Sequence, residues 1–182
     1  MLESLTFVTG NPGKAEQLGH FLDFPVRYKN LDLIEIQSLD LEAIIEYKAR
    51  EAYMHVQSPV LVEDASLQLL ALGKLPGPFI KWFFTELGTD GLCELLDEAM
   101  DRAALATVQF GMYDGQSFRL FTGTKEGSIA LSPRGKNGFG WDSVFIPTGY
   151  HQTWAEMDTN EARVTSMRII ALKKLEAYLK AR

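Results

Sequence analysis

The order of strand-like and helix-like segments constrains the fold of this chain more than any other feature of its sequence. In the first half, apolar strand-like runs alternate with helical patterns: strands at Leu5–Thr9, Val26–Leu31 and Val60–Val62, and helices at Lys14–Leu22 and Leu41–Val56, the second with Asp40 as its predicted N-cap. Such alternation is typical of parallel strands joined by helices. The first half therefore predicts an α/β arrangement.

The second half follows a different pattern. Ala106–Tyr113 and Ser117–Thr122 flank Asp114-Gly115, a strong signal for an antiparallel hairpin. Short helices are predicted at Ile80–Glu86 and Asp90–Ala99, and a further strand at Gly127–Leu131. A helix at Thr165–Leu179, with Ile169, Leu172, Leu175 and Leu179 facing inward, closes the chain. Together the halves predict a mixed α/β fold.

Length and charge limit the number of domains and the kinds of partner that the chain can have. A chain of 182 residues with 46% hydrophobic residues is typical of one globular domain, so we expect residues 1–182 to form a single domain, with two lobes. The formal net charge of −6 disfavours a nucleic-acid partner, because such proteins usually present a basic face. A small anion carried with a divalent metal remains compatible with this charge, because acidic residues can hold the metal.

Cysteine content and the start of the chain indicate the compartment. Cys93 has no second cysteine to pair with, so we expect no intramolecular disulfide and no cysteine-based metal site. Met1–Thr6 has no basic segment and only a short apolar run, so we expect no signal peptide. No stretch approaches the length of a membrane span. These observations predict a cytoplasmic protein that does not bind membranes.

The segment Thr9-Gly10-Asn11-Pro12-Gly13-Lys14 is the first candidate for chemistry. A strand, a glycine-containing turn and a helix start direct backbone N–H groups and the positive end of the helix dipole toward a bound anion. Lys14 adds a full positive charge. The segment is not a Walker A loop, because its glycine spacing is too short and Ala15 follows the lysine. It is either a phosphate-binding turn or an ordinary strand-to-helix connection.

Glu63 and Asp64 are the second candidate, at the predicted carboxyl end of the Val60–Val62 strand. Ligands of α/β sheets bind at such ends. Two adjacent carboxylates can hold Mg²⁺ and activate a water molecule. The alternative, which Glu-Asp in isolation favours, is a solvated loop or a helix N-cap.

Aromatic residues among glycines are the third candidate. Phe139, Gly140, Trp141 and Asp142 follow Pro133-Arg134-Gly135, and two rings beside an acid can form a slot for a flat base. A buried aromatic corner is equally compatible with the pattern. Arg168 begins the last helix, where it can donate hydrogen bonds to a carbonyl or a phosphate, or lie on the surface.

Taken together, these segments resemble the inosine triphosphate pyrophosphatase family over nearly the whole chain. The resemblance is carried, in family order, by Thr9–Lys14, Val62-Glu63-Asp64, Pro76–Phe83, Pro133–Asp142, Phe145–Tyr150 and Ala155-Glu156-Met157. It implies an elongated mixed sheet with two α/β lobes flanking a central substrate cleft. It also implies hydrolysis of aberrant purine nucleoside triphosphates of the inosine, deoxyinosine and xanthosine type to the monophosphate and pyrophosphate. Dependence on Mg²⁺ or Mn²⁺ and a homodimer are further implications.

The resemblance also implies roles for single residues. Thr9, Asn11, Lys14, Lys48 and Lys81 would bind the triphosphate. Glu35, Glu63 and Asp64 would form the acidic metal cluster, with Asp64 as the catalytic group that positions or deprotonates the attacking water. Phe139, Gly140, Trp141, Asp142 and Arg168 would bind the base and its 6-oxo group, with which an arginine donor pairs better than with the amino group of adenine.

The chain departs from the family pattern in three segments. Met167 stands where the family usually has a histidine, Ala162 where it usually has a lysine, and Ala65-Ser66 follows the catalytic acid. The phosphate and metal residues are present while the base-reading residues are fewer, so a shifted or relaxed base preference is our hypothesis. The sequence is also compatible with a nucleotide-binding homologue of weak or no catalysis, and with a phosphatase or pyrophosphatase acting on a different small phosphorylated metabolite.

Overall fold

The computed structural model describes residues 3–97 and 100–181. Met1 and Leu2, in the segment tested for a signal peptide, and Ala99, the predicted end of a helix, lie outside the described residues. Helices and strands follow one another along the chain as β1 (Leu5–Val8), α1 (Pro12–Phe21), β2 (Val26–Lys29), α2 (Leu41–Val56), β3 (Val60–Leu69), β4 (Pro76–Gly77), α3 (Ile80–Glu94), β5 (Ala103–Tyr113), β6 (Phe118–Ile129), β7 (Phe145–Pro147), α4 (Thr159–Thr165) and α5 (Met167–Lys180). A short 3-10 turn at Leu70–Leu72 follows β3.

The strands form one mixed sheet, and the predicted α/β class is confirmed. Its strand order is β2-β1-β3-β5-β6-β7, with β4 paired to β3. β1 is parallel to both β2 and β3, with Phe7 opposite Leu61, whereas β3 pairs with β4, and β6 with β7, in antiparallel fashion. The parallel part comes from the strand–helix alternation of the first half.

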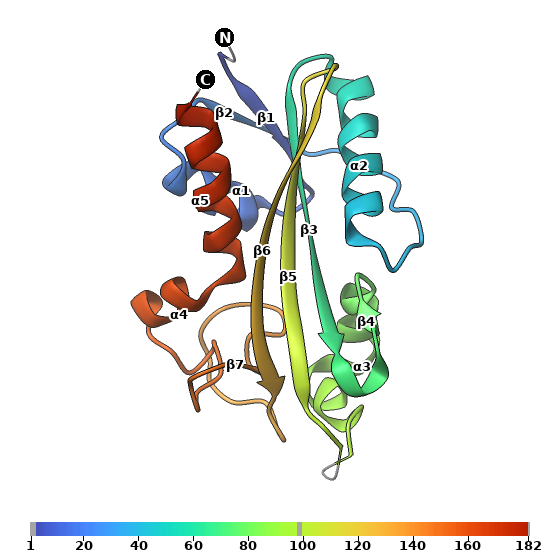
Figure 1. The fold of residues 1–182 in the computed structure, drawn as a ribbon, viewed down its shortest axis with the longest axis vertical. Coiled ribbons are helices and arrows are strands. Elements are labelled where there is room, and N and C mark those ends of the chain that lie inside the picture. Colours follow the sequence, from blue (N-terminus) through green and yellow to red (C-terminus); the bar gives the residue numbers. More distant parts are fainter. Residues whose placement is uncertain (1–2, 98–99, 182) are drawn as a thin grey trace. The chain divides into compact units, whose positions relative to one another are not determined.

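The chain divides into two compact units. Unit 1 contains Met1–Asp64, Val108–Gly123 and Ile170–Arg182, and unit 2 contains Ala65–Thr107 and Thr124–Ile169. Within unit 1, α2 covers one face of the strands and α1 and α5 cover the other (Figure 1). The side of unit 1 under α2 has a core of seven buried residues, Val8, Leu41, Ile45, Ala49, Ala52, Val60 and Val62.

Unit 2 has a core of its own. It includes Leu67 and Leu69 of β3, Leu92 and Cys93 of α3, and Phe145 of β7. Burial raises the pKa of the Cys93 thiol. Within the described residues, no helix is both long and apolar enough to cross a membrane.

Several predicted boundaries need correction. Glu63 and Asp64 do not end their strand, because β3 continues to Leu69 and its last part pairs with β4. The strands predicted at Ser117–Thr122 and Gly127–Leu131 are one strand, β6. The predicted break between two helices near residue 88 occurs inside α3, at Gly88, whose φ of 67° lies in the left-handed region.

The closing helix also differs from its prediction. It consists of two helices, α4 and α5, separated at Ser166, whose ψ of 123° is not helical. Leu172, Leu175 and Leu179 are buried as predicted, whereas Ile169 is only half-buried. By contrast, α2 has the predicted bounds, and the Asp40 side chain accepts hydrogen bonds from the amides of Glu42 and Ala43.

Candidate active site

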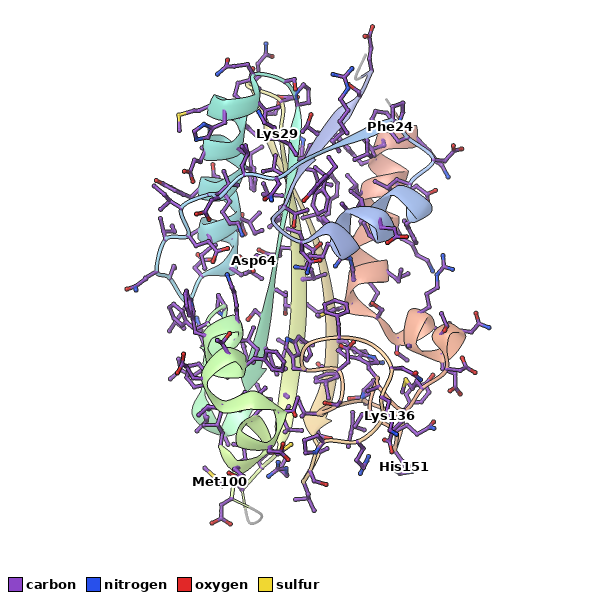
Figure 2. The ribbon with its side chains drawn as sticks, turned by 180° about the vertical axis from the view of Figure 1, so that it is seen from behind. Phe24, Lys29, Asp64, Met100, Lys136 and His151 are labelled. Atoms are coloured by element: carbon purple, nitrogen blue, oxygen red, sulfur yellow. The ribbon has the colours of Figure 1, made fainter. Side chains whose placement is uncertain are left out.

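Unit 1 contains a lysine held between two carboxylates. Lys48 lies in the middle of α2 and is 9% exposed. Its Nζ donates to Glu35 Oε1 at 2.9 Å and to Asp64 Oδ2 at 3.0 Å. Figure 2 labels Asp64 on β3, beside α2. The structure therefore brings together three residues that are 13 and 16 positions apart in sequence and that the family resemblance assigned to phosphate and metal binding.

The two carboxylates keep this lysine charged. Burial by itself lowers the pKa of Lys48, because an ammonium group is poorly solvated in the interior. The negative charges of Asp64 and Glu35, and the hydrogen bonds to them, outweigh burial and raise the pKa above its ordinary value of 10.5. Lys48 is thus a cation at neutral pH, available to a negatively charged substrate.

Lys14 and Glu63 form a second ion pair in unit 1. Lys14 Nζ, at the start of α1, lies 3.0 Å from Glu63 Oε1, and the Glu63 side chain is only 2% exposed. Glu63 and Asp64 are neighbours in β3, and consecutive side chains of a strand point to opposite faces. The lysine partners of the two carboxylates are consistent with this alternation. Lys14 belongs to α1 and Lys48 to α2, and these helices lie on opposite sides of the strands (Figure 1). Glu63 thus pairs with Lys14, and Asp64 with Lys48.

The turn before α1 is ordered by its own side chains. Asn11 is the N-cap of α1, and its Oδ1 accepts a hydrogen bond from the Lys14 amide at 3.2 Å. The Asn11 amide in turn donates to Thr9 Oγ1 at 3.1 Å. These bonds fix the strand–turn–helix geometry expected from the sequence, with the Lys14 side chain in the first turn of the helix.

Glu35 and Asp64 are the residues of unit 1 that could hold a metal ion together with a substrate. Among residues 3–97 and 100–181, histidine, cysteine, aspartate and glutamate side chains form no group of three or more that could hold a metal ion. Glu35 and Asp64 nevertheless direct carboxylate oxygens at one positive charge, the Lys48 ammonium. Mg²⁺ is usually held by one or two carboxylates together with substrate phosphates and water, so two carboxylates suffice.

The remaining candidates belong to unit 2. Lys81 lies on α3 and is exposed, and its Nζ lies 5.4 Å from the centre of the Trp82 ring. Arg168 lies in the first turn of α5 and is half-buried. Phe139, Gly140, Trp141 and Asp142 follow one another in the loop before β7.

The two aromatic candidates have different environments. The Trp141 ring packs against Phe145 and Trp154, with centroid distances of 5.9 and 5.8 Å, at the edge of the unit 2 core. Phe139 is 55% exposed. Trp141 thus belongs to a largely buried aromatic corner, while more than half of the Phe139 surface is exposed to solvent.

Asp142 organises the loop that carries Phe139. Its Oδ2 accepts a hydrogen bond from the Phe139 amide at 2.9 Å. Gly138 has a φ of 76°, and a Cβ at this position would overlap the Asp142 carboxylate. Burial raises the pKa of Asp142 from 3.8 to about 6, although the hydrogen bond from Phe139 opposes this shift.

We expect Asp142→Asn to remove a pH-dependent loss of stability. The folded protein retains a proton that the unfolded chain releases between pH 3.8 and about 6, so the free energy of unfolding falls as pH rises through this window. Asparagine does not titrate, but its oxygen can still accept from the Phe139 amide. The free energy of unfolding, measured with urea at pH 4 and at pH 7, should fall between these two pH values by on the order of 1–2 kcal/mol more in the wild type than in the variant. Equal losses would contradict this assignment.

Sequence reasoning missed Glu51, a carboxylate on the buried face of α2 that is 8% exposed. Its Oε2 accepts a hydrogen bond from the amide of Ile34, the residue before Glu35. The available signal was its spacing, because Glu51 lies three residues after Lys48 and such positions share one face of a helix.

Lysines paired with carboxylates, one at the start of α1 and one in the middle of α2, are typical of enzymes that act on phosphorylated substrates. Comparison with known proteins is more specific. The chain belongs to the Ham1 family, whose model matches residues 5–178.

Relatives support this assignment. "Inosine triphosphate pyrophosphatase 2" of Trypanosoma cruzi is 46% identical over 178 residues, covering 96% of this chain and 91% of the relative. "Inosine triphosphate pyrophosphatase" of Yarrowia lipolytica is 41% identical, covering 97% and 95%. A HAM1 protein from Coxiella burnetii has a similar structure, with a TM-score of 0.88, 28% identity and coverage of 100% of both chains. The predicted family of nucleoside triphosphate pyrophosphatases is thereby confirmed.

Proposed function

We propose that this protein hydrolyses aberrant purine nucleoside triphosphates, of the inosine, deoxyinosine and xanthosine type, to the monophosphate and pyrophosphate. The observation that carries the proposal is the buried Lys48 between Glu35 and Asp64. Relatives named inosine triphosphate pyrophosphatase, 38–46% identical to this chain, support the same substrate class.

Unit 1 supplies residues for the triphosphate and its metal. Glu35 and Asp64 would hold Mg²⁺, or Mn²⁺ in its place. When bound, the ion would neutralise phosphate charge and favour departure of pyrophosphate. Lys14 and Lys48, together with the amides at the start of α1, would bind phosphate oxygens. The predicted role of Glu63 at the metal stays a prediction, since its carboxylate is paired with Lys14.

Asp64 is the residue that we assign to the chemical step. Its carboxylate would take the proton of a water molecule as the water oxygen attacks the α-phosphorus. The bond from the α-phosphorus to the bridging oxygen then breaks, and pyrophosphate leaves with the electron pair. Lys48, held 3.0 Å from Asp64, would stabilise negative charge that develops on the phosphate oxygens.

The predicted contacts to the base stay predictions. Phe139 offers an exposed ring for stacking, and Arg168 offers a cationic donor for a 6-oxo group. Lys81 stays a predicted phosphate contact. The predicted homodimer and cytoplasmic location stay predictions as well.

We expect Arg168→Ala to alter the choice among bases more than the rate on the best substrate. Loss of a charged donor should reduce the ratio of kcat/KM for inosine triphosphate over adenosine triphosphate by roughly tenfold. Arg163→Ala is the matched control, because Arg163 is an exposed arginine of α4. An equal loss on every base would instead make Arg168 a phosphate contact.

One observation favours a shifted base preference as the second candidate. Met167 and Ala162 are partly buried and pack against the unit 2 core, and neither side chain can donate a strong hydrogen bond to a base. An enzyme with fewer polar contacts to the base should discriminate less between bases.

A pyrophosphate-release screen tests the proposed function directly. Purified protein is offered inosine, deoxyinosine, xanthosine and the four common ribonucleoside triphosphates, with Mg²⁺, with Mn²⁺ and with a chelator. Metal-dependent release of pyrophosphate from inosine or xanthosine triphosphate supports the proposal. A strong preference for inosine triphosphate over all common nucleotides would refute the shifted preference. Tight nucleotide binding without pyrophosphate release would favour a non-catalytic homologue.

A further inference from the structure

Glu51 is a buried carboxylate for which the proposed mechanism gives no role. It is 8% exposed, and its Oε2 lies 2.9 Å from the Ile34 amide nitrogen, which donates to it. Burying a carboxylate is unfavourable unless a strong interaction compensates. A hydrogen bond from an amide to an ionised carboxylate is such an interaction, being roughly twice as strong as one between neutral groups.

The Ile34 amide belongs to the segment that carries Glu35. Residues 30–37 form neither helix nor strand, so no backbone ladder fixes them. Leu31 and Leu33 pack partly against the unit 1 core, whereas the Ile34 side chain is 62% exposed and provides little anchoring of its own. At Ile34 and Glu35 the segment is held by α2 through the Glu51 and Lys48 side chains.

These two attachments act at adjacent points. Lys48 and Glu51 are three positions apart on α2 and therefore share one face of the helix. They hold consecutive loop residues: Glu51 holds the Ile34 backbone, and Lys48 holds the Glu35 side chain. The bond to Glu51 restricts the loop backbone at the residue before Glu35. It does so without occupying the Glu35 carboxylate.

We propose that Glu51 is a positioning residue that holds the Glu35 carboxylate in place for the metal. This inference rests on the proposed function, in which Glu35 and Asp64 hold Mg²⁺. Glu35 pairs with Lys48 in the structure while the bond to Glu51 fixes the backbone beside it. Without that bond, the loop would be freer to move and the Glu35 carboxylate would leave this position for solvent. Groups that orient metal ligands typically contribute 10–100-fold in metal affinity.

Two substitutions at this position separate the hydrogen bond from general packing. Glu51→Gln keeps an oxygen that can accept from the Ile34 amide, whereas Glu51→Met has similar length and no strong acceptor. Glu46→Gln is the control, because Glu46 is a half-exposed carboxylate on the same helix, paired with Arg50 at 2.6 Å.

The first measurement is amide hydrogen exchange, which requires no activity. Glu51→Met should lose protection at the Ile34 amide, while Glu51→Gln and Glu46→Gln should retain it. Unchanged protection at Ile34 in Glu51→Met would overturn the inference, because the hydrogen bond would then not hold the loop.

The second measurement is the Mg²⁺ concentration that gives half-maximal hydrolysis of inosine triphosphate. Glu51→Met should raise it by about tenfold, with kcat at saturating Mg²⁺ nearly unchanged. Glu51→Gln should restore the half-maximal concentration to near the wild-type value. A merely structural role would lower kcat through loss of folded enzyme and leave the Mg²⁺ dependence unaltered, which would also overturn the inference.

The wild type separates failure of the proposed function from failure of the role of Glu51. If wild-type protein shows no Mg²⁺-dependent hydrolysis of any triphosphate in the screen, the proposed function fails, and with it the role of Glu51 toward a metal. If the wild type is active and the Glu51→Met variant has the same Mg²⁺ dependence, the role of Glu51 fails while the proposed function stands.

Discussion

Asp64→Asn should reduce pyrophosphate release from inosine triphosphate by roughly 1,000-fold or more, which is within the range for loss of a general base. The asparagine side chain has the same shape and can still accept a hydrogen bond from Lys48 Nζ, which lies 3.0 Å from Asp64 Oδ2 in the wild type. It cannot take a proton from water, and it is a weaker ligand for Mg²⁺. Steady-state kinetics with saturating Mg²⁺ would measure the loss.

Binding and folding should change much less than the rate in this variant. Asp64 is one of two carboxylates that raise the pKa of Lys48, so its neutralisation should lower that pKa toward its ordinary value. Glu35 still pairs with Lys48, and the lysine should stay charged at neutral pH. Asp23→Asn, an exposed position of the same unit, is the matched control. A wild-type rate in Asp64→Asn would remove Asp64 from the chemical step.

The accuracy of the predictions depended on whether local sequence determines the element. The bounds of α2 were correct because its apolar spacing and its Asp40 cap are local features. The end of β3 was wrong because Glu63-Asp64 interrupts the apolar run. The alternation resumes at Leu67 and Leu69, which are buried by pairing and packing with distant segments. Non-local pairing of this kind leaves little trace in a short window of sequence.

The candidate site shows the same limit. Spacing alone gave reasons to consider the turn before Lys14 and the pair Glu63 and Asp64, but it gave none for Glu35 or Lys48. Those two residues entered through the family resemblance, and the structure places both in one cluster with Asp64. Likewise, adjacency in sequence implied that Glu63 and Asp64 act together. The alternation of a strand instead gives them different lysine partners.

The second large effect concerns the stability of unit 2. The Arg102 guanidinium donates hydrogen bonds to four backbone carbonyls: those of Cys93, Leu96, Ile129 and Ala130, at 2.7–2.9 Å. Cys93 lies in the last turn of α3, where a cation also interacts favourably with the helix dipole. Arg102 thus joins the end of α3 to the end of β6.

Arg102→Met should lower the free energy of unfolding by about 3–5 kcal/mol, because methionine leaves four carbonyls in a partly buried region without this donor. For a chain of this length, that loss corresponds to a decrease in Tm of roughly 10 °C. All three tryptophans, Trp82, Trp141 and Trp154, belong to unit 2, so their fluorescence during urea unfolding reports on the part of the molecule that the substitution affects.

Arg119→Met provides the comparison that isolates the carbonyl network. Arg119 is exposed on β6 and donates to the carbonyl of its neighbour Phe118, so the same change of side chain should cost less than about 1 kcal/mol there. If both variants unfold at the same urea concentration, the four hydrogen bonds of Arg102 contribute no net stability. The junction between α3 and β6 would then depend on the apolar contacts of the unit 2 core alone.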